Sequence, residues 1–368
     1  MKLVIFGNGA IGKTLRAIQD FKCIDVVSVD INEKASPDLV GDINNATFRD
    51  SLLKKGDVLA DLTKDNDSVP LATWCYHNGI GYLNTDLSCP FGIEEKYHEI
   101  MEMSKEYNKN PTGTVLFSHG MNPGLVSHYF AEIMSKCNID SKDVEEGHIS
   151  EIDTQISDKM PDRDTVISTW CVTGNFTDTV DGSSLHKKDY WQKRLGKIND
   201  FARDNIYWTK NPWTGKFTTY LSGNHEEVYE LGGKYDIPMC FSYKSPVQFN
   251  EATKQMDRGV TFKSHIMSDD VICGYNAVGV YLRKKDGIEY WCGSKLEINE
   301  ARAKIRNNVK DVRMNATTML VAAGVYAGLA YVIEHPNAGW RMPSDIDSSW
   351  IIERAKPFLG EYFVGQLV

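Results

Sequence analysis

The sequence lacks several features that mark particular classes of protein. Its eight cysteines are scattered, with no Cys-X-X-Cys pair and no clustering with histidine, so neither a zinc or other metal site nor a disulfide framework is expected. Positive charge is in deficit, because 41 lysines and arginines face 50 acids and give a formal net charge of −9. This balance disfavours a nucleic-acid partner and mildly favours a cationic ligand.

Long hydrophobic runs are also scarce. The N-terminus begins at a strand-like segment, residues 2–6, without the basic region or the long apolar stretch of a signal peptide. No run reaches the about 20 apolar residues that a membrane-spanning helix needs. Residues 317–333 come nearest, but their glycines and polar flanks favour a buried helix. We therefore expect a cytoplasmic protein with no membrane partner.

Glycine, in contrast, is placed with regular spacing near the N-terminus. After the strand-like KLVIF, Gly7, Gly9 and Gly12 have the spacing GxGxxG and precede a helix-like segment, residues 13–21. In this motif the first glycine permits a tight turn, the second lets the backbone approach a pyrophosphate, and the third lets helix and strand pack closely. The phosphates would bind at the helix N-terminus, where free N–H groups favour negative charge.

The residue that follows the second strand sharpens this hypothesis. The segment DVVSVD ends at Asp30, about 20 residues beyond the glycines, where a carboxylate can accept hydrogen bonds from ribose hydroxyls. The carboxylate would repel a 2′-phosphate, and no arginine follows it in residues 31–34. The pattern indicates NAD as cofactor; the alternative is a glycine-rich turn in another α/β protein.

Strand-like and helix-like segments continue to alternate up to about residue 125. Strands are expected at 56–63, 80–86 and 113–124, with helices at 68–79 and 93–107 between them. This rhythm predicts a Rossmann-type, doubly wound parallel sheet. Because ligands bind beyond the carboxyl ends of such strands, the residues after each strand become candidates.

Beyond residue 126 the pattern changes. Several short strand-like runs rich in tyrosine, tryptophan and threonine, including residues 166–174 and 215–223, predict a second, mixed α+β domain. Its clearest hairpin turn is expected at residues 284–287. Helical stretches are expected at about 309–334 and 346–359. We therefore expect a cofactor-binding domain at 1–125, rejoined by residues 309–368, and a substrate and dimerisation domain at 126–308.

Several motifs together resemble homospermidine synthase, of the saccharopine dehydrogenase-like group. They are HGMNPGLVSHYF (119–130), EIDTQISD (151–158), STWCVTG (168–174), GNHE (223–226) and much of residues 274–340. The resemblance extends over nearly the whole chain. It implies an NAD-dependent oxidation of putrescine to an imine, exchange of ammonia for a second amine, and reduction to homospermidine. It also implies a homodimer built through the second domain.

The resemblance carries over unevenly to individual residues. Asn122 matches the asparagine of the family's NPG loop, which lies close to cofactor and substrate, Asp153–Gln155 match its DTQ, and Trp170 matches its NTW tryptophan. At three positions the residue differs, since Ser88 and Thr173 stand where the family has acids and Lys244 where it has a histidine. Lost acids weaken a diammonium site. Two alternatives therefore remain, a reductase of carboxylated imines such as saccharopine or carboxynorspermidine, and a non-catalytic NAD-binding protein.

These arguments give two sets of candidate residues. The expected cofactor-binding residues are Gly7, Gly9, Ala10, Ile11, Gly12, Asp30, Asp61, Leu62, Thr63, Thr85, Asp86, Asn122, Pro123 and Thr154. The candidate catalytic residues are Asn122, Trp170, His225, Glu226, Tyr243 and Lys244, with His119 also considered for proton transfer. Structural alternatives are a hydrogen-bonded His119, a core Trp170, a solvated Lys244 and an exposed loop pair at Glu226 and Glu227.

Overall fold

The computed structural model describes residues 1–63, 67–87, 92–159, 162, 164–181, 206–221, 225–253, 261–312 and 314–368. The chain divides into two compact units. Unit 1 comprises Met1–Leu125, Lys304–Arg313 and Met319–Ala355, and unit 2 comprises Val126–Ala303, Met314–Thr318 and Lys356–Val368.

Unit 1 is built on a seven-stranded sheet whose described pairs are all parallel. Its strands, in spatial order, are β3 (Leu39–Val40), β2 (Asp25–Asp30), β1 (Lys2–Phe6), β4 (Val58–Asp61), β5 (Gly81–Asn84), β6 (Thr114–Leu116) and β17 (Gly339–Arg341). The order reverses between β1 and β4, which is the topological switch point of a doubly wound sheet. The predicted Rossmann-type fold is therefore confirmed.

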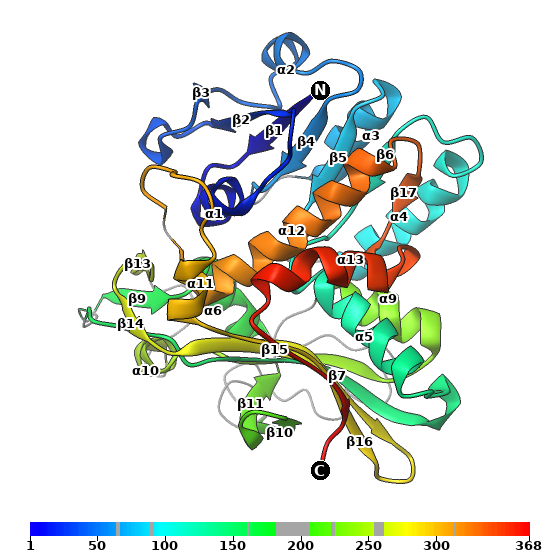
Figure 1. Ribbon diagram of the computed structural model, residues 1–368, viewed down its shortest axis with the longest axis vertical. Coiled ribbons are helices and arrows are strands. Elements are labelled where there is room, and N and C mark those ends of the chain that lie inside the picture. The colour runs from blue at the N-terminus through cyan, green and yellow to red at the C-terminus, as the bar shows by residue number, and fades with distance from the viewer. Residues whose placement is uncertain are drawn as a thin grey trace. The chain divides into compact units, whose positions relative to one another are not determined.

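Helices cover both faces of this sheet (Figure 1). The helices of unit 1 are α1 (Ala10–Ile18), α2 (Ala46–Leu52), α3 (Ser68–His77), α4 (Ile93–Tyr107), α12 (Ala316–Glu334, in this unit from Met319) and α13 (Ser348–Ala355). Alternate sheet residues such as Val4, Leu59 and Tyr82 form one core with residues of α2, α3 and α4. On the other face, α12 is so close to β5 that a side chain at Gly81 would touch Val332.

Unit 2 contains a second seven-stranded sheet, which is mixed. Its strands, in spatial order, are β10 (Ile206–Asn211), β11 (Gly215–Leu221), β12 (Met239–Lys244), β7 (Val144–Asp153), β15 (Tyr275–Lys284), β16 (Glu289–Glu297) and β18 (Glu361–Gln366). Only the β12–β7 pair is parallel among the pairs described for this sheet. The predicted hairpin joins β15 to β16, where Gly287 N–H bonds to the Lys284 carbonyl.

Two small two-stranded sheets and short helices complete unit 2. The small sheets pair β13 (Lys263–Ile266) with β9 (Thr165–Ser168), and β14 (Val271–Cys273) with β8 (Ile156–Ser157). The helices are α5 (Leu125–Lys136), α6 (Val172–Asp181), α9 (Glu226–Tyr235), α10 (Val247–Thr253) and α11 (Ile298–Ala303). Short 3₁₀ turns lie at Glu33–Ala35, Ser141–Asp143, Pro343–Asp345 and Lys356–Phe358.

The structure corrects the expected course of the C-terminal segment. We expected residues 309–368 to rejoin the first domain, but Met314–Thr318 and Lys356–Val368 belong to unit 2. The reason is β18, which pairs antiparallel with β16 after the helix α13 has ended at Ala355. Gly360, with φ of +74°, permits the change of direction.

Within the described chain, one helix passes the length and composition test for a membrane span. It is α12, with a mean hydropathy of 1.7 over its best window, 78% of which is buried in the structure. Core helices of soluble proteins have the same properties.

Candidate functional site

The glycine-rich turn of unit 1 has the geometry of a phosphate-binding loop. Gly7 has φ of +101°, and a Cβ there would lie 2.7 Å from the Leu62 carbonyl oxygen. A Cβ at Gly12 would overlap the carbonyl oxygen of Gly7, whereas a Cβ at Gly9 would meet no protein atom within 4 Å. Two glycines are thus required by close backbone packing. The third leaves open space at the start of α1.

The N-terminus of α1 supplies the donors for such a group. Gly9 is the N-cap and has no side chain, and the first turn carries no acid. Ala10, Ile11 and Gly12 precede the first turn-closing hydrogen bond, which runs from Lys13 N–H to the Gly9 carbonyl. Their N–H groups are the unsatisfied donors that a helix offers to an anion.

Asp30 is fixed beside this turn. One carboxylate oxygen accepts the Asn8 N–H and the other accepts the Asn32 N–H, both at 2.8 Å. Each oxygen keeps a second lone pair that can accept from a ribose hydroxyl. The nearby Arg16 pairs with Asp38 at 2.9 Å and donates to the Ser28 hydroxyl. Its charge is therefore already compensated, which fits a cofactor without a 2′-phosphate.

Asp61, at the end of β4, bonds to its own surroundings. It accepts from the Thr63 hydroxyl at 2.6 Å and from the Tyr82 hydroxyl at 2.9 Å. Burial raises the pKa of Asp61, and the bonds from Thr63 and Tyr82 act against that rise. The carboxylate orders the turn that contains Leu62 and Thr63, so its contribution to a ligand would be indirect.

The loop after β6 contains Asn122 and Pro123, joined by a cis peptide bond. The loop closes on itself, because Gly120 N–H bonds to the Pro123 carbonyl and Leu125 N–H to that of Gly120. Asn84, the last residue of β5, accepts the Ser118 N–H at 2.7 Å. Thr85 and Asp86 follow Asn84 directly. The structure thus brings Asn122, Pro123 and Thr85 to neighbouring strand ends, while Asn122 remains half-buried.

His119 lies in the same loop but is enclosed by protein. Its Nδ1 is 3.0 Å from the Gly324 carbonyl, so Nδ1 carries the proton. Burial lowers the pKa of His119 to about 4. A side chain on Gly328 of α12 would touch the imidazole. This geometry favours the structural alternative, a neutral histidine that joins the loop to α12.

In unit 2, a fully buried carboxylate organises the end of β7. Asp153 accepts from the hydroxyls of Thr169 and Thr317, at 2.5 and 2.7 Å, and from the side-chain amide and backbone N–H of Gln155. Burial raises the pKa of Asp153, and these hydrogen bonds oppose the rise. The residues that match the family's DTQ therefore form a clamp that holds neighbouring segments together, because Gln155 also accepts the Ala316 N–H.

An aromatic row lies beside this clamp. The rings of His225 and Phe241 are 4.4 Å apart, those of Phe241 and Tyr243 are 6.3 Å apart, and those of Tyr243 and Trp170 are 6.5 Å apart. Phe241 and Tyr243 alternate along β12, so they point to one face of the sheet. Burial and the negative charges of Asp153 and Glu151 raise the pKa of Tyr243. Tyr243 is therefore a neutral phenol.

The start of α9 corrects one alternative from the sequence. Glu226 and Glu227 are 2% and 1% exposed, so they are a buried pair rather than an exposed one. His225 is the N-cap residue, and its Nδ1 lies 3.5 Å from Glu227 Oε1. The structure therefore brings His225 and Phe241 together with two buried acids, of which the sequence analysis named only Glu226 as a candidate.

Lys244 and Thr154 are not placed with these groups. Lys244 pairs in register with Ile152 and follows Tyr243 by one residue, so it points to the opposite face of the sheet. The Thr154 hydroxyl is used within the sheet, where it bonds to the backbone of Tyr275. Thr173 is exposed, and its hydroxyl contacts the Cys171 sulfur. Ser88 lies outside the described residues.

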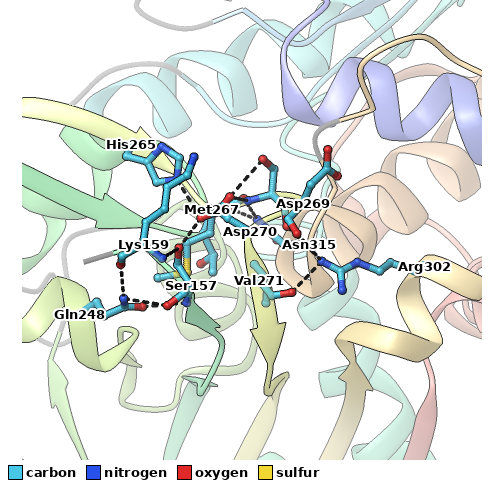
Figure 2. A network of polar contacts seen from close by, with 12 residues as sticks. Ser157, Lys159, Gln248, His265, Met267, Asp269, Asp270, Val271, Arg302 and Asn315 are labelled. Carbon is cyan, nitrogen blue, oxygen red and sulfur yellow. Dashed lines mark hydrogen bonds and ion pairs between the residues drawn. The ribbon is translucent and has the colours of Figure 1, made fainter. Parts of the chain in front are cut away.

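Figure 2 shows a polar network that includes Ser157, His265, Asp270, Arg302 and Asn315. Asp270 accepts from the Ser157 hydroxyl and lies 2.9 Å from His265 Nε2, which joins β8 to β13. Arg302 of α11 donates to the Val271 carbonyl. Asn315 donates to the carbonyls of Met267 and Thr169. Through Asn315 the network reaches the carbonyl of Thr169, the residue that precedes Trp170.

Sequence reasoning missed two residues on the face that carries Tyr243. Glu151 and Asn276 lie on β7 and β15, and the Asn276 amide donates to Glu151 at 2.6 Å. The signal was available, because Glu151 and Asp153 are two acids that alternate at the end of a strand-like segment, on either side of Ile152. Among the described residues, no group of three or more histidine, cysteine or acidic side chains could hold a metal ion.

The fold and the open glycine turn define the class, a Rossmann-type protein with a dinucleotide-binding loop. No protein-family model matches the chain. The chain is 25% identical to a curated homospermidine synthase of Mesorhizobium japonicum, over 81% of this chain and 73% of that protein. This match confirms the resemblance inferred from the motifs.

Solved structures show the same fold. Homospermidine synthase from Legionella pneumophila in complex with NAD superposes with a TM-score of 0.81 at 21% identity, over 100% of this chain and 91% of that chain. Apo saccharopine dehydrogenase (L-Glu forming) from Saccharomyces cerevisiae has a TM-score of 0.63 at 12% identity, over 100% and 99% of the two chains.

Proposed function

We propose that this protein is an NAD-dependent, homospermidine synthase-like enzyme. The observation that carries the proposal is the match to a curated homospermidine synthase over most of both chains. In the proposed reaction two putrescine molecules give one homospermidine and one ammonia. One amine is oxidised to an imine, the second amine displaces ammonia, and the new imine is reduced, so no net oxidant is consumed.

The residues of unit 1 fit the cofactor. The open space at Gly9, the free N–H groups of the first turn of α1 and the carboxylate of Asp30 suit the pyrophosphate and ribose of NAD. When bound, NAD supplies the hydride acceptor and returns the hydride later. Leu62, Thr63, Thr85, Asp86, Asn122 and Pro123, at neighbouring strand ends, remain our candidates for contacts with the cofactor.

The protein must orient the amine and exclude water that would release an aldehyde from the imine. We propose that Asn122 positions the amine, since it is half-buried in a loop held by Asn84. We assign the aromatic faces of Trp170 and Tyr243 to cation–π contact with ammonium groups, and His225 with Glu226 to proton transfer. Lys244, on the opposite face of β12, does not support the alternative reaction on carboxylated imines.

The decisive experiment is mass spectrometry of the products after incubation of the protein with NAD and isotopically labelled putrescine. We expect labelled homospermidine and ammonia, both lost in the variant Asp30→Ala. Failure to detect either product, with NAD binding intact, would refute the synthase proposal. Reduction of a keto acid and diamine mixture by NADH would support the imine reductase instead, and NAD binding without any turnover would support a non-catalytic protein.

We also propose a cytoplasmic homodimer that forms through unit 2. The support for this assembly is the resemblance of the chain to homospermidine synthase. In addition, β18 lies at the edge of its sheet, and an edge strand can offer unpaired backbone groups to a partner. Light scattering after size exclusion gives the mass directly. A species of the 41.5 kDa chain mass at micromolar concentration would contradict the dimer.

A further inference from the structure

The loop that follows β2 is held against the glycine-rich turn by a side chain of the turn itself. Residues 31–38 run from Asp30 to the short edge strand β3. The Asn8 side chain, in a residue that is 1% exposed, donates to the carbonyls of Ala35 and Ser36 at 2.9 and 3.0 Å. Because the Asn8 N–H also donates to Asp30, one residue fixes both the carboxylate and the loop. In a Rossmann fold the carboxylate at this position meets the ribose 2′-hydroxyl.

Arg16 brings a positive charge to the same region. It extends from α1, and its Nη1 donates to the Ser28 hydroxyl at 2.9 Å and lies 3.5 Å from Asn8 Oδ1. Ser28 and Asp30 are two residues apart on β2, so their side chains project from the same face of the sheet. In folds of this kind an arginine in this neighbourhood accommodates the 2′-phosphate of NADP.

Asp38 pairs with this arginine. Its carboxylate lies 2.9 Å from Arg16 Nη2 and accepts the Ser28 backbone N–H at 2.8 Å and the Ser28 hydroxyl at 2.9 Å. Burial acts to raise the pKa of Asp38, but the hydrogen bonds from Ser28 and the charge of Arg16 make the net shift downward. The side chains of Arg16 and Asp38 are 21% and 45% exposed, so a ligand phosphate could compete for the guanidinium.

The charges of these three side chains favour one dinucleotide over the other. A phosphate monoester carries about −1.5 to −2 charge at pH 7. A 2′-phosphate would be repelled by Asp30, and the guanidinium that could bind it in bidentate fashion is already shared with Asp38. A 2′-hydroxyl is uncharged and can donate to Asp30.

We propose that Asp38 is a second determinant of cofactor specificity, which selects NAD over NADP by holding Arg16 away from the 2′-position of the ribose. This inference rests on the cofactor of the proposed function and deepens it, because it names a residue that excludes the phosphorylated dinucleotide. Asp30 alone does not account for the exclusion. An arginine is present at the site, although it comes from α1 rather than from residues 31–34.

The test measures the ratio of the dissociation constants for NADP and NAD by calorimetry. In wild-type protein NAD should bind more tightly. Asp38→Asn keeps an acceptor for the Ser28 N–H and removes the charge that pairs with Arg16. It should lower the ratio about 10- to 100-fold, as expected for a charge-assisted hydrogen bond gained by the phosphate. Adding Arg16→Met should abolish this gain. If the gain persists, the phosphate binds another cation, such as the exposed Lys34, and the inference fails.

Asp42→Asn is the matched control. Asp42 is an exposed acid shortly after β3, and its carboxylate accepts the Asn44 N–H. The substitution removes the same charge without releasing an arginine, so it should change the ratio by less than about threefold. Thermal unfolding of each variant establishes that it is folded. A similar fall in the ratio for Asp42→Asn and Asp38→Asn, or equal weakening of both dinucleotides in Asp38→Asn, would overturn the inference.

If NADP binding by Asp38→Asn is too weak to measure, the comparison is repeated in an Asp30→Asn background, where the repulsion is smaller. No gain in NADP affinity on adding Asp38→Asn there would overturn the inference, as would wild-type protein that binds both dinucleotides equally or neither. Because the readout is binding, it needs no turnover of an amine. A protein that binds NAD but makes no homospermidine fails the proposed reaction and still tests Asp38.

Discussion

The two units present binding groups of different kinds. At the switch point of unit 1 the backbone offers them, since Gly9 leaves open space and the first turn of α1 has free N–H groups. On the face of the unit 2 sheet the polar groups belong to side chains, as in Glu151, Asn276 and Tyr243. Backbone donors suit phosphates of any nucleotide, whereas side-chain acceptors are specific to the shape and charge of a substrate.

Because of this difference, the two regions should tolerate substitution differently. A backbone site is sensitive where a Cβ would enter protein and insensitive, for folding, where a Cβ would enter open space. A side-chain site is sensitive wherever one polar atom has several partners. Substitutions in the two regions should therefore differ in effect, and the largest should come from a Cβ that enters protein backbone.

The largest effect is expected for Gly12→Ala. The new Cβ would overlap the backbone carbonyl of Gly7, which cannot move without displacing the turn. We expect a loss of about 3 kcal/mol in the free energy of unfolding, from overpacking against backbone, together with loss of NAD binding. Gly9→Ala is the matched variant. Urea denaturation should give a change below about 1 kcal/mol for it.

Titration with NAD completes this comparison. Gly9→Ala should bind NAD at least about tenfold more weakly, if the pyrophosphate lies at the open position. Unchanged affinity in a folded Gly9→Ala would show that the open space is not the phosphate site.

The second prediction concerns the pH dependence of stability through His119. Its folded pKa of about 4 lies below the ordinary 6.5, so the unfolded chain binds the proton more readily. The contribution is fully present above pH 6.5 and is lost as pH falls towards 4, by about 3 kcal/mol in all. His119→Asn, which keeps a donor for the Gly324 carbonyl, should lack this slope.

Other buried groups act in the opposite sense. The raised pKa values of Asp61 and Asp153 favour protonation of the folded state at low pH. Wild type and His119→Asn both contain these two acids. The difference between their free energies of unfolding, measured by denaturation from pH 7 to 4.5, therefore reports the contribution of the histidine alone. Parallel curves would contradict a buried neutral His119.

The two regions also differ in how far sequence predicted them. The glycine turn, the parallel strands and Asp30 follow from local spacing, because each depends on residues adjacent in the chain. The juxtaposition of Glu151, Tyr243 and Asn276 depends on register between β7, β12 and β15, which no local pattern contains. Two segments were misjudged for related reasons.

The first misjudged segment is the strand-like run 166–174. It changes to helix α6 at Val172, where Asn175 N–H bonds to the Cys171 carbonyl and the Asn175 side chain bonds to Ser168. Tertiary contacts override β propensity there. The second is the long C-terminal helix. It begins at Ala316 rather than near 309 because Asn315 accepts the Thr318 N–H as a helix cap.

The third prediction tests the side-chain region through Thr317→Val, which preserves shape and removes one hydroxyl. That hydroxyl donates to Asp153 and accepts from Gln155 and Asn276. Unsatisfied buried partners should lower the free energy of unfolding by about 2 kcal/mol. Thr47→Val, at an exposed position of α2, is the control and should change it by less than about 0.5 kcal/mol. If Thr317→Val and wild type unfold at the same urea concentration, the Thr317 hydroxyl does not contribute to the hydrogen bonds around Asp153.

The smallest effect is expected for Thr173→Glu, which restores an acid at a position where the resembled family has one. Thr173 is exposed in the first turn of α6, a turn that contains no acid. A carboxylate there should stabilise the helix by about 0.5 kcal/mol through the helix dipole, and Thr173→Gln should not. If the rings of Trp170 and Tyr243 hold the ammonium group, as proposed, Thr173→Glu should leave KM for putrescine within about twofold of wild type, well below the factor of ten that 1.4 kcal/mol gives. A fall of tenfold or more in that KM, seen with Glu and not with Gln, would show instead that the substrate reaches α6. The recognition of the diamine would then be shared between the strands of the sheet and the helix.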